Sequence, residues 1–145
     1  MSHSLTKIWI HSILGVKNKQ ALINDEVAPL IYKHIEESLL SIDCKPRIIN
    51  GVEDHIHLLF LLSPKIAVAD LEKKIKGETS HWINQQNLIK DKFAWQVGNG
   101  AFSVSESNVK SVQSYIKTQK EHHEKMTFEE EYNLFLKKHG ILINR

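Results

Sequence analysis

Apolar side chains recur along this chain in patterns that predict a mixed α and β fold. The clearest pattern is in the segment 51–62, where successive side chains of an extended strand point to opposite faces. One face would carry Ile56, Leu58, Phe60 and Leu62, and the other His55, His57, Leu59 and Leu61. Because both faces are apolar toward the C-terminal end, we expect a central strand that is covered on both sides.

The other elements follow from the same kind of pattern. Strands are expected over 5–15, over 46–49 and, after an aromatic stretch that begins at Phe93, over 101–105. Helical periodicity predicts helices over 25–42, 68–86 and 107–123, and a capping box at Thr127 and Glu130 starts a last helix that Gly140 ends. Asn50-Gly51 predicts a turn or a bulge between two antiparallel strands. This order predicts one domain over 1–145, an α+β ferredoxin-like sandwich with a mainly antiparallel sheet and helices on one face.

Composition indicates the cellular compartment of the protein rather than its function. The 145 residues include 19 basic and 17 acidic side chains, and this balance permits a nucleic-acid partner without arguing for one. The single cysteine, Cys44, excludes an internal disulfide and suits a reducing compartment. The longest apolar run, 58–62, is too short to cross a membrane. We therefore expect a soluble cytoplasmic protein.

The two histidines of the central strand are the first candidate chemistry. Adjacent imidazoles on one face of a buried strand are costly unless something occupies them, and a divalent cation would do so. The simpler interpretation is that His55 and His57 are structural residues with satisfied hydrogen bonds. Two ligands do not complete a metal site, so the metal interpretation needs a further donor from elsewhere in the chain.

Tyr115 and Gln119 lie one helical turn apart in the predicted helix 107–123. A phenol can attack phosphorus if a cation polarises the phosphate, and two imidazoles with an amide oxygen would hold such a cation with positions left open. The oxygen donor suits Mg²⁺ or Mn²⁺, and the imidazoles shift the preference toward Mn²⁺. Alternatively, Tyr115 is a buried tyrosine whose hydroxyl is satisfied by the protein.

Together these residues resemble the HUH superfamily of single-strand nucleases, specifically the single-tyrosine transposases of minimal insertion sequences and their REP-associated relatives. The HUH motif, histidine-hydrophobic-histidine, corresponds to His55-Ile56-His57, and the Tyr-x-x-x-Gln helix to Tyr115 through Gln119. The similarity also includes the patterns at 51–59, 76–82, 102–105 and 121–123. Close relatives tend to carry an aromatic residue where this chain has Asn99, which puts in doubt a base-stacking contact from that loop.

The resemblance implies a ferredoxin-like fold and transesterification of a single-stranded DNA substrate that contains hairpins. Tyr115 would be the nucleophile that forms a 5′-phosphotyrosine link, and His55, His57 and Gln119 would bind Mg²⁺ or Mn²⁺. It also implies an obligate homodimer in which the tyrosine helix completes the partner's site.

DNA contacts and alternative functions complete the expectations from sequence. Basic side chains on the predicted helices are candidate phosphate contacts, although for the lysines of the helix 68–86 a solvated helix face is the favoured explanation; the candidates are Lys73, Lys74, Lys76, Lys117, Lys120 and His122. One alternative is a domesticated, non-catalytic protein that binds single-stranded or hairpin DNA on the same scaffold. An RNA-binding ferredoxin-like module is a third alternative, but it predicts exposed aromatics on the sheet rather than a histidine pair, and no ribonucleoprotein motif appears in the sequence.

Overall fold

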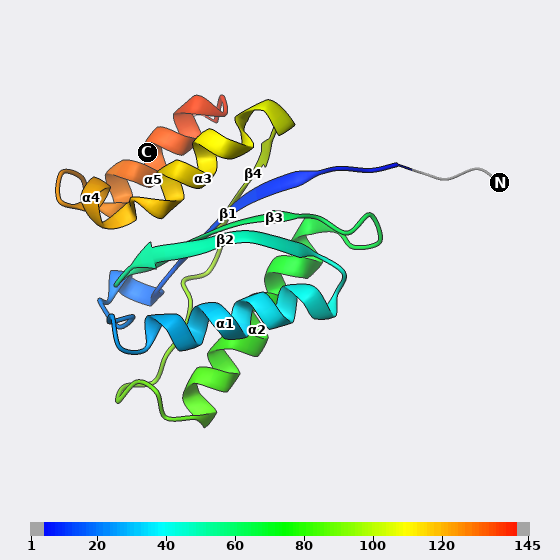
Figure 1. The fold of residues 1–145 in the computed structure, drawn as a ribbon. Helices are drawn as coiled ribbons and strands as arrows, with labels where there is room; N and C mark the ends of the chain where they lie inside the picture. Colours follow the sequence, from blue (N-terminus) through cyan, green and yellow to red (C-terminus); the bar gives the residue numbers. More distant parts are fainter. Residues whose placement is uncertain (1–4, 142–145) are drawn as a thin grey trace.

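A four-stranded antiparallel sheet forms the centre of the molecule. A computed structural model describes residues 5–141 and orders the strands β2-β3-β1-β4 (Figure 1). Their bounds are β1 Trp9–Gly15, β2 Lys45–Val52, β3 His55–Leu61 and β4 Gly100–Val104. The strand that carries the two histidines, β3, pairs with β1 on one side and β2 on the other. The predicted α+β fold, with both histidines on a central strand, is confirmed.

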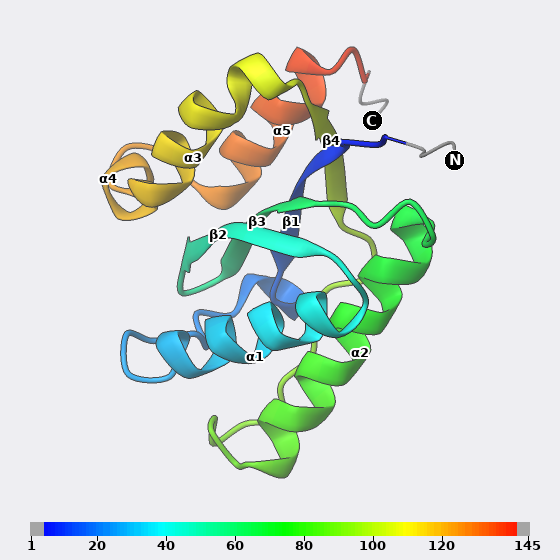
Figure 2. The same ribbon diagram turned by 45° about the vertical axis from the view of Figure 1, so that its right-hand side comes forward.

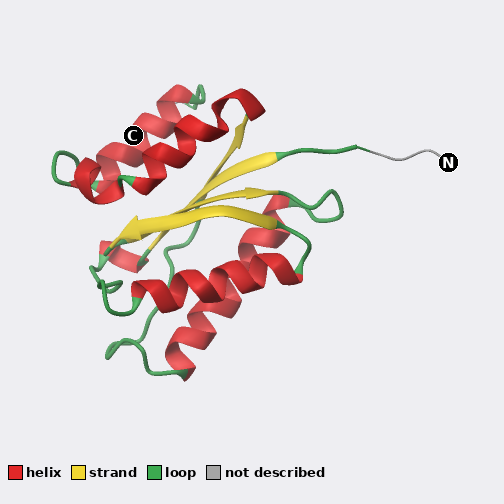
Figure 3. Ribbon diagram, in the orientation of Figure 1, coloured by secondary structure: helices red, strands yellow, loops and turns green. Residues whose placement is uncertain are grey.

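Helices cover both faces of this sheet (Figures 1 and 2). One face carries α1 Ala28–Ser41 and α2 Val68–Gln85, which form the helical layer that the sequence predicted. The other face carries α3 Val109–Lys117, α4 Gln119–His123 and α5 Phe128–Lys138, a second layer beyond the one-sided arrangement that we expected. Short 3₁₀ turns, η1 Lys17–Lys19 and η2 Glu106–Asn108, connect elements, as the secondary-structure colouring in Figure 3 shows.

The two faces of β3 pack in the alternating way that the sequence predicts. Ile56, Leu58 and Phe60 belong to the large core beneath α1 and α2. Leu59 packs on the opposite face with Val109 and Ile116 of α3. The histidines alternate in step with Leu59 and therefore face the layer of α3, α4 and α5.

The predicted turn at Asn50-Gly51 is wrong, because both residues lie within β2 and the chain reverses at Glu53 and Asp54. Gly51 pairs with Ile56 across the two strands. A Cβ atom added at Gly51 would lie 2.2 Å from the carbonyl oxygen of His55 and 2.8 Å from the Cα of Ile56. The glycine is therefore needed for the close approach of β2 to the strand of histidines and not for a turn.

Replacing Gly51 with alanine is expected to destabilise the fold by about 1–3 kcal/mol, since the clash involves backbone atoms that cannot rotate away. Urea denaturation measures this change. Gly77→Ala is the matched control, because an added Cβ at this position in α2 meets nothing within 4 Å and should be neutral or stabilising. Equal stabilities of the two variants would contradict the close approach.

The last third of the chain departs from the predicted helix 107–123 in one respect. The helix is interrupted at Thr118, whose φ of −104° and ψ of 31° separate α3 from α4. The expected capping box is present at the start of α5: the Thr127 side chain accepts from the Glu130 backbone N–H, and the Glu130 carboxylate accepts from Thr127 N–H. This cap fixes where α5 begins and so which of its side chains point to the sheet.

No helix among residues 5–141 is both long enough and apolar enough to span a membrane.

Candidate metal and nucleophile site

His55 and His57 lie fully buried on β3 with both imidazoles already oriented by neighbours. The Nδ1 atom of His55 is 2.7 Å from Asp54 Oδ1. The Nδ1 atom of His57 is 2.8 Å from Nε2 of His11, which lies beside it on β1. Such partners fix the tautomer and ring orientation of metal-ligating histidines. Because these partners contact Nδ1, the Nε2 atoms of His55 and His57 both face the same point beside the sheet.

Glu131 of α5 is the residue that meets these imidazoles. Its Oε1 atom lies 3.0 Å from Nε2 of His55, 3.0 Å from Nε2 of His57 and 3.1 Å from Nε2 of His123. One ligand atom from each of the four residues falls within 4.8 Å of the others. Three imidazoles and a carboxylate that converge in this way are a donor set suited to a divalent cation.

Burial and hydrogen bonding shift the pKa values of this cluster in opposite directions. Burial lowers the pKa of His57, and the Glu131 carboxylate compensates only in part. For His55 burial acts in the same direction, but hydrogen bonds to Asp54 and Glu131 outweigh it and the pKa is raised. Burial alone would raise the pKa of Glu131, whereas the hydrogen bonds from His123, His55 and His57 bring it well below its usual range. Glu131 is therefore a carboxylate at neutral pH.

Tyr115 of α3 points its hydroxyl at the same carboxylate. The hydroxyl donates a hydrogen bond to Oε2 of Glu131, the oxygen that does not face the imidazoles. The phenol ring meets the His57 ring edge-on at a centroid distance of 6.0 Å and stacks on His122 at 4.4 Å. Burial and the neighbouring Glu131 charge raise the pKa of Tyr115, so the phenol is neutral in this arrangement. The nucleophile predicted from sequence thus lies beside the predicted histidines.

Gln119 at the start of α4 completes the group. Its side chain is buried, and Nε2 donates to Oε2 of Glu131 at 3.2 Å. Its Oε1 atom is buried without a hydrogen-bond partner. A buried amide oxygen without a donor is costly, and a cation beside it would remove that cost. The unpartnered oxygen and the converging nitrogens both fit the metal that the sequence led us to expect.

Asn50 of β2 holds the tyrosine helix over this site. It pairs with His57 across the strands, and its Nδ2 donates to the carbonyl oxygens of Ile116 at 2.9 Å and Lys117 at 3.2 Å. These carbonyls belong to the last turn of α3, where the helix is interrupted and its carbonyls lack intrahelical partners. Asn50 therefore ties the residues next to Tyr115 to the strand beside the histidines.

Three residues of the site were not predicted to be there from the sequence. His11 lies on the same face of β1 as Trp9 and Ile13, and Glu131 lies on the face of α5 that also carries Phe128 and Phe135. A charged residue on the apolar stripe of an amphipathic helix is a usable signal of a buried role. His123 gave no such signal, since it follows another histidine in a polar segment.

The predicted DNA contacts are spread over different parts of the surface. Lys73 and Lys76 line a hollow on α2 together with Asn99, whereas Lys74 forms a 3.0 Å ion pair with Glu78. Lys120 forms a 2.8 Å ion pair with Asp25. The other two are Lys117, exposed at the end of α3, and His122, which stacks on Tyr115.

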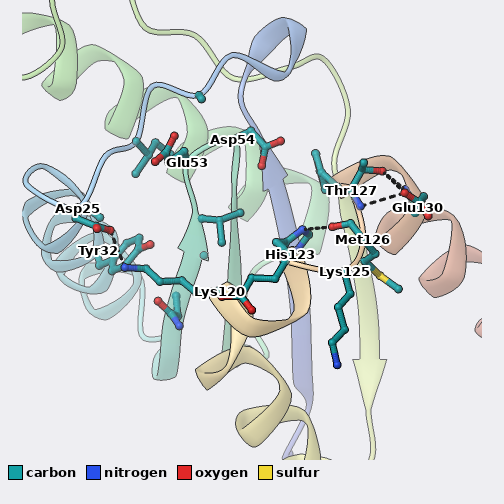
Figure 4. A pocket seen from close by; sticks show the side chains of 18 of the residues that line it. Asp25, Tyr32, Glu53, Asp54, Lys120, His123, Lys125, Met126, Thr127 and Glu130 are labelled. Carbon is teal, nitrogen blue, oxygen red and sulfur yellow. Dashed lines mark hydrogen bonds and ion pairs between the residues drawn. The ribbon is translucent and has the colours of Figure 1, made fainter.

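Two hollows border the cluster. Figure 4 shows the larger, of about 1070 Å³, into which His123 and Asp54 project together with further acidic side chains. The other, of about 600 Å³, lies between β4, α3 and α5 and is lined by Tyr115, Glu131, Phe102, Lys138 and His139. The second hollow gives direct access to the phenol.

Comparisons with known proteins place this geometry in a family context. The sequence profile described as "Transposase IS200 like" matches residues 4–119. A candidate transposase of Deinococcus radiodurans R1 has 21% sequence identity and a TM-score of 0.66, over 82% of this chain and 95% of its own. A REP-associated tyrosine transposase bound to a REP hairpin has 12% identity and a TM-score of 0.62, over 85% of this chain and 74% of its own. At these identities the two structures show a shared fold. No curated protein sequence matches the chain.

Proposed function

Since the chain belongs to the IS200-like transposase family, we propose that it cleaves and rejoins single-stranded DNA through a covalent bond between Tyr115 and a 5′-phosphate. The observation that carries this proposal is the meeting of the Tyr115 hydroxyl with Glu131, which also contacts both histidines of β3. A lone buried tyrosine would need only one hydrogen-bond partner, whereas this one is placed at a cluster of metal-type donors.

In the proposed reaction Glu131 Oε2 accepts the proton of Tyr115, whereas Oε1 faces the imidazoles. Tyr115 Oη attacks the scissile phosphorus, its proton passes to Glu131 Oε2, and the bond from phosphorus to the 3′-oxygen breaks. The departing 3′-oxygen takes a proton from water and becomes a free 3′-hydroxyl, and Glu131 returns the proton of Tyr115 to the solvent, so that the carboxylate is restored. In the reverse direction a 3′-hydroxyl attacks the phosphotyrosine and restores the phosphodiester. The bond energy is retained in the covalent link, so this exchange needs no nucleotide cofactor.

A divalent cation belongs to this proposal. His55, His57 and Gln119 would hold it, and the convergence of His123 and Glu131 on the same point makes these two residues further donors. When bound, the cation would polarise the phosphate and stabilise the negative charge of the transition state. The predominance of imidazole nitrogen favours Mn²⁺ over Mg²⁺.

The DNA would reach Tyr115 through the hollow between β4, α3 and α5. This hollow contains Lys138, His139 and the aromatic ring of Phe102, which suit phosphate and base contacts. The hollow of Figure 4 carries Asp25, Glu53, Asp54, Glu124 and Glu130 against Lys120 and Lys125. Its acidic excess repels a phosphate backbone. We extend the proposal to substrates that contain hairpins and to a cytoplasmic location, both in line with the family resemblance.

Covalent capture of DNA tests the proposal. Single-stranded fragments from both sides of the encoding gene are incubated with the protein and Mn²⁺ and then separated under denaturing conditions. We expect a slower-migrating protein–DNA species that requires Mn²⁺ and that fully duplex fragments do not give. Adduct formation that continues undiminished in EDTA would refute the metal role, and complete absence of adducts on all fragments would refute the proposed chemistry.

We also propose that the protein is a homodimer with active sites shared between chains. The proposal rests on the family resemblance. In the single chain, Tyr115 lies against the chain's own His57, so sharing requires α3 to exchange between protomers. Gly98, with a φ of +83° in the segment before β4, is a point where the chain can change direction on the way to α3.

Mixed dimers distinguish active sites that are shared between chains from active sites that are built within one chain. If sites are shared, combining His57→Ala chains with Tyr115→Phe chains is expected to restore one of the two sites in each mixed dimer, up to half of the unmodified dimer's activity, because that site receives an intact histidine pair and an intact tyrosine. Adduct yield in purified heterodimers measures this. No recovery above either parent would show that each site is built within one chain.

A further inference from the structure

A buried glutamate on the other side of the sheet is not used by the proposed reaction. Glu72 of α2 is 4% exposed, and the Ser12 hydroxyl of β1 donates to its Oε1 at 2.6 Å. Its Oε2 atom is buried and has no hydrogen-bond partner. A buried carboxylate oxygen without a donor is destabilising, so its retention requires an explanation outside folding.

Glu72 lies in the wall of a hollow of about 460 Å³. The other residues of this hollow are Val68, Ala69, Lys73, Lys76 and Asn99. Lys76 donates to the carbonyl oxygens of Gln96 at 2.9 Å and Gly98 at 3.3 Å, which holds the segment of Asn99 against α2. The hollow thus combines a buried acceptor, an amide and ammonium groups at its rim.

This combination selects for a ligand that carries hydrogen-bond donors at one end and an anion at the other. Each carboxylate oxygen has two acceptor positions, and Ser12 uses only one position on Oε1, so both oxygens of Glu72 retain unused acceptor positions. Lys73 is exposed at the rim, where it can contact a phosphate. A nucleotide has both features.

Among the DNA bases, guanine matches the carboxylate best. Its pairing edge presents two adjacent donors, N1–H and the N2 amino group, and these can bind both oxygens of one carboxylate. Adenine and cytosine present a donor next to an acceptor, and thymine a donor between two acceptors. We propose that this hollow binds an unpaired guanine nucleotide of the DNA strand, with Glu72 reading the base and Lys73 contacting its phosphate.

Burial raises the pKa of Glu72 to about 7 despite the Ser12 hydrogen bond and the charge of Lys76. Two donors from a guanine would stabilise the charged form. The inference rests on the proposed DNA substrate, but it concerns a site on α2, which lies on the face of the sheet opposite α3 (Figure 1). Binding can therefore be tested independently of cleavage.

The test compares guanine with inosine, which lacks only the N2 amino group. Fluorescence anisotropy is recorded for the full chain in EDTA with short oligothymidylates that contain a single guanine or a single inosine. We expect guanine to bind about tenfold more tightly, the effect of one hydrogen bond to a charged acceptor. Equal affinities for the two oligonucleotides would overturn the proposal.

Variants then identify the residues that cause the preference for guanine over inosine. Glu72→Gln keeps the shape but replaces one acceptor with a donor, so the preference for guanine should fall below about twofold. Lys73→Ala should weaken both oligonucleotides equally and reduce the salt dependence by about one charge. Lys74→Ala is its control, because Lys74 lies outside the hollow and is paired with Glu78. If a Glu72→Gln protein with an unchanged melting temperature retains the full preference for guanine, Glu72 is not the residue that recognises the base.

Three further outcomes distinguish this proposal from binding of a free nucleotide and from the proposed cleavage reaction. Competition by free dGMP as effective as that by the oligonucleotide would overturn the assignment to a DNA strand. If adducts form with Mn²⁺ but guanine and inosine bind equally, the nucleotide site is wrong and the reaction stands. A guanine preference without adduct formation would support the nucleotide site and contradict the proposed reaction.

Discussion

Replacing His57 with alanine is expected to abolish metal-dependent DNA cleavage, with adduct formation reduced about a thousandfold or more. The reason is that the Nε2 atom of His57 is one of the nitrogens that converge on the Glu131 carboxylate, and loss of cation binding removes several kcal/mol of transition-state stabilisation. The same variant should bind Mn²⁺ at least tenfold more weakly, which electron paramagnetic resonance of free Mn²⁺ measures without any DNA.

His81→Ala is the matched control, since His81 is exposed on α2, on the other side of the sheet. It should leave both Mn²⁺ affinity and adduct yield unchanged. Glu131→Gln extends the test to a residue that the sequence did not suggest, and it should also weaken Mn²⁺ binding. A His57→Ala protein that is folded and still forms adducts at the unmodified rate would exclude a metal site at these histidines.

Removing only the hydroxyl of Tyr115 is expected to eliminate covalent adducts altogether. Tyr115→Phe keeps the ring against His57 and His122 but deletes the attacking oxygen. Stability should change by no more than about 1 kcal/mol, because a single hydrogen bond to Glu131 is lost. Hairpin binding should be retained, and denaturing gels together with thermal unfolding measure the two effects.

Tyr32→Phe and Tyr132→Phe are the controls for the chemistry of the phenol. Tyr32 packs against the core beneath the sheet, and Tyr132 packs with Phe102 and Phe128. Neither contacts the histidine cluster through a hydrogen bond in the described part of the chain. Both variants should therefore form adducts at normal yield, and loss of adducts in either of them but not in Tyr115→Phe would reassign the nucleophile.

The sequence predicted the local features of this molecule well. Alternation placed His55 and His57 on one face of β3, and the burial of Leu58 and Leu59 on opposite faces confirms it. The capping box at Thr127 located the start of α5 correctly. These features depend on residues that are neighbours in the chain, so a pattern of a few positions is sufficient to find them.

Features that depend on contacts between distant segments were not predictable in the same way. The role of Gly51 is visible only when β2 lies against β3, and a dipeptide rule assigned it to a turn. The interruption at Thr118 turns α4 so that Gln119 and His123 reach the cluster. Glu131 meets His55 over a separation of 76 residues. Helical periodicity gives the face of Glu131 but not the strand that this face will cover.

The central claim is that Tyr115 forms the bond to DNA, and peptide mapping of a trapped adduct tests it most directly. The adduct formed with Mn²⁺ is digested with protease and nuclease, and mass spectrometry then locates the residual nucleotide on the peptides. The account predicts a 5′-phosphate attached to Tyr115 and to no other residue. A 5′-phosphate on any other side chain, or a 3′-phosphate linkage at Tyr115, would contradict it.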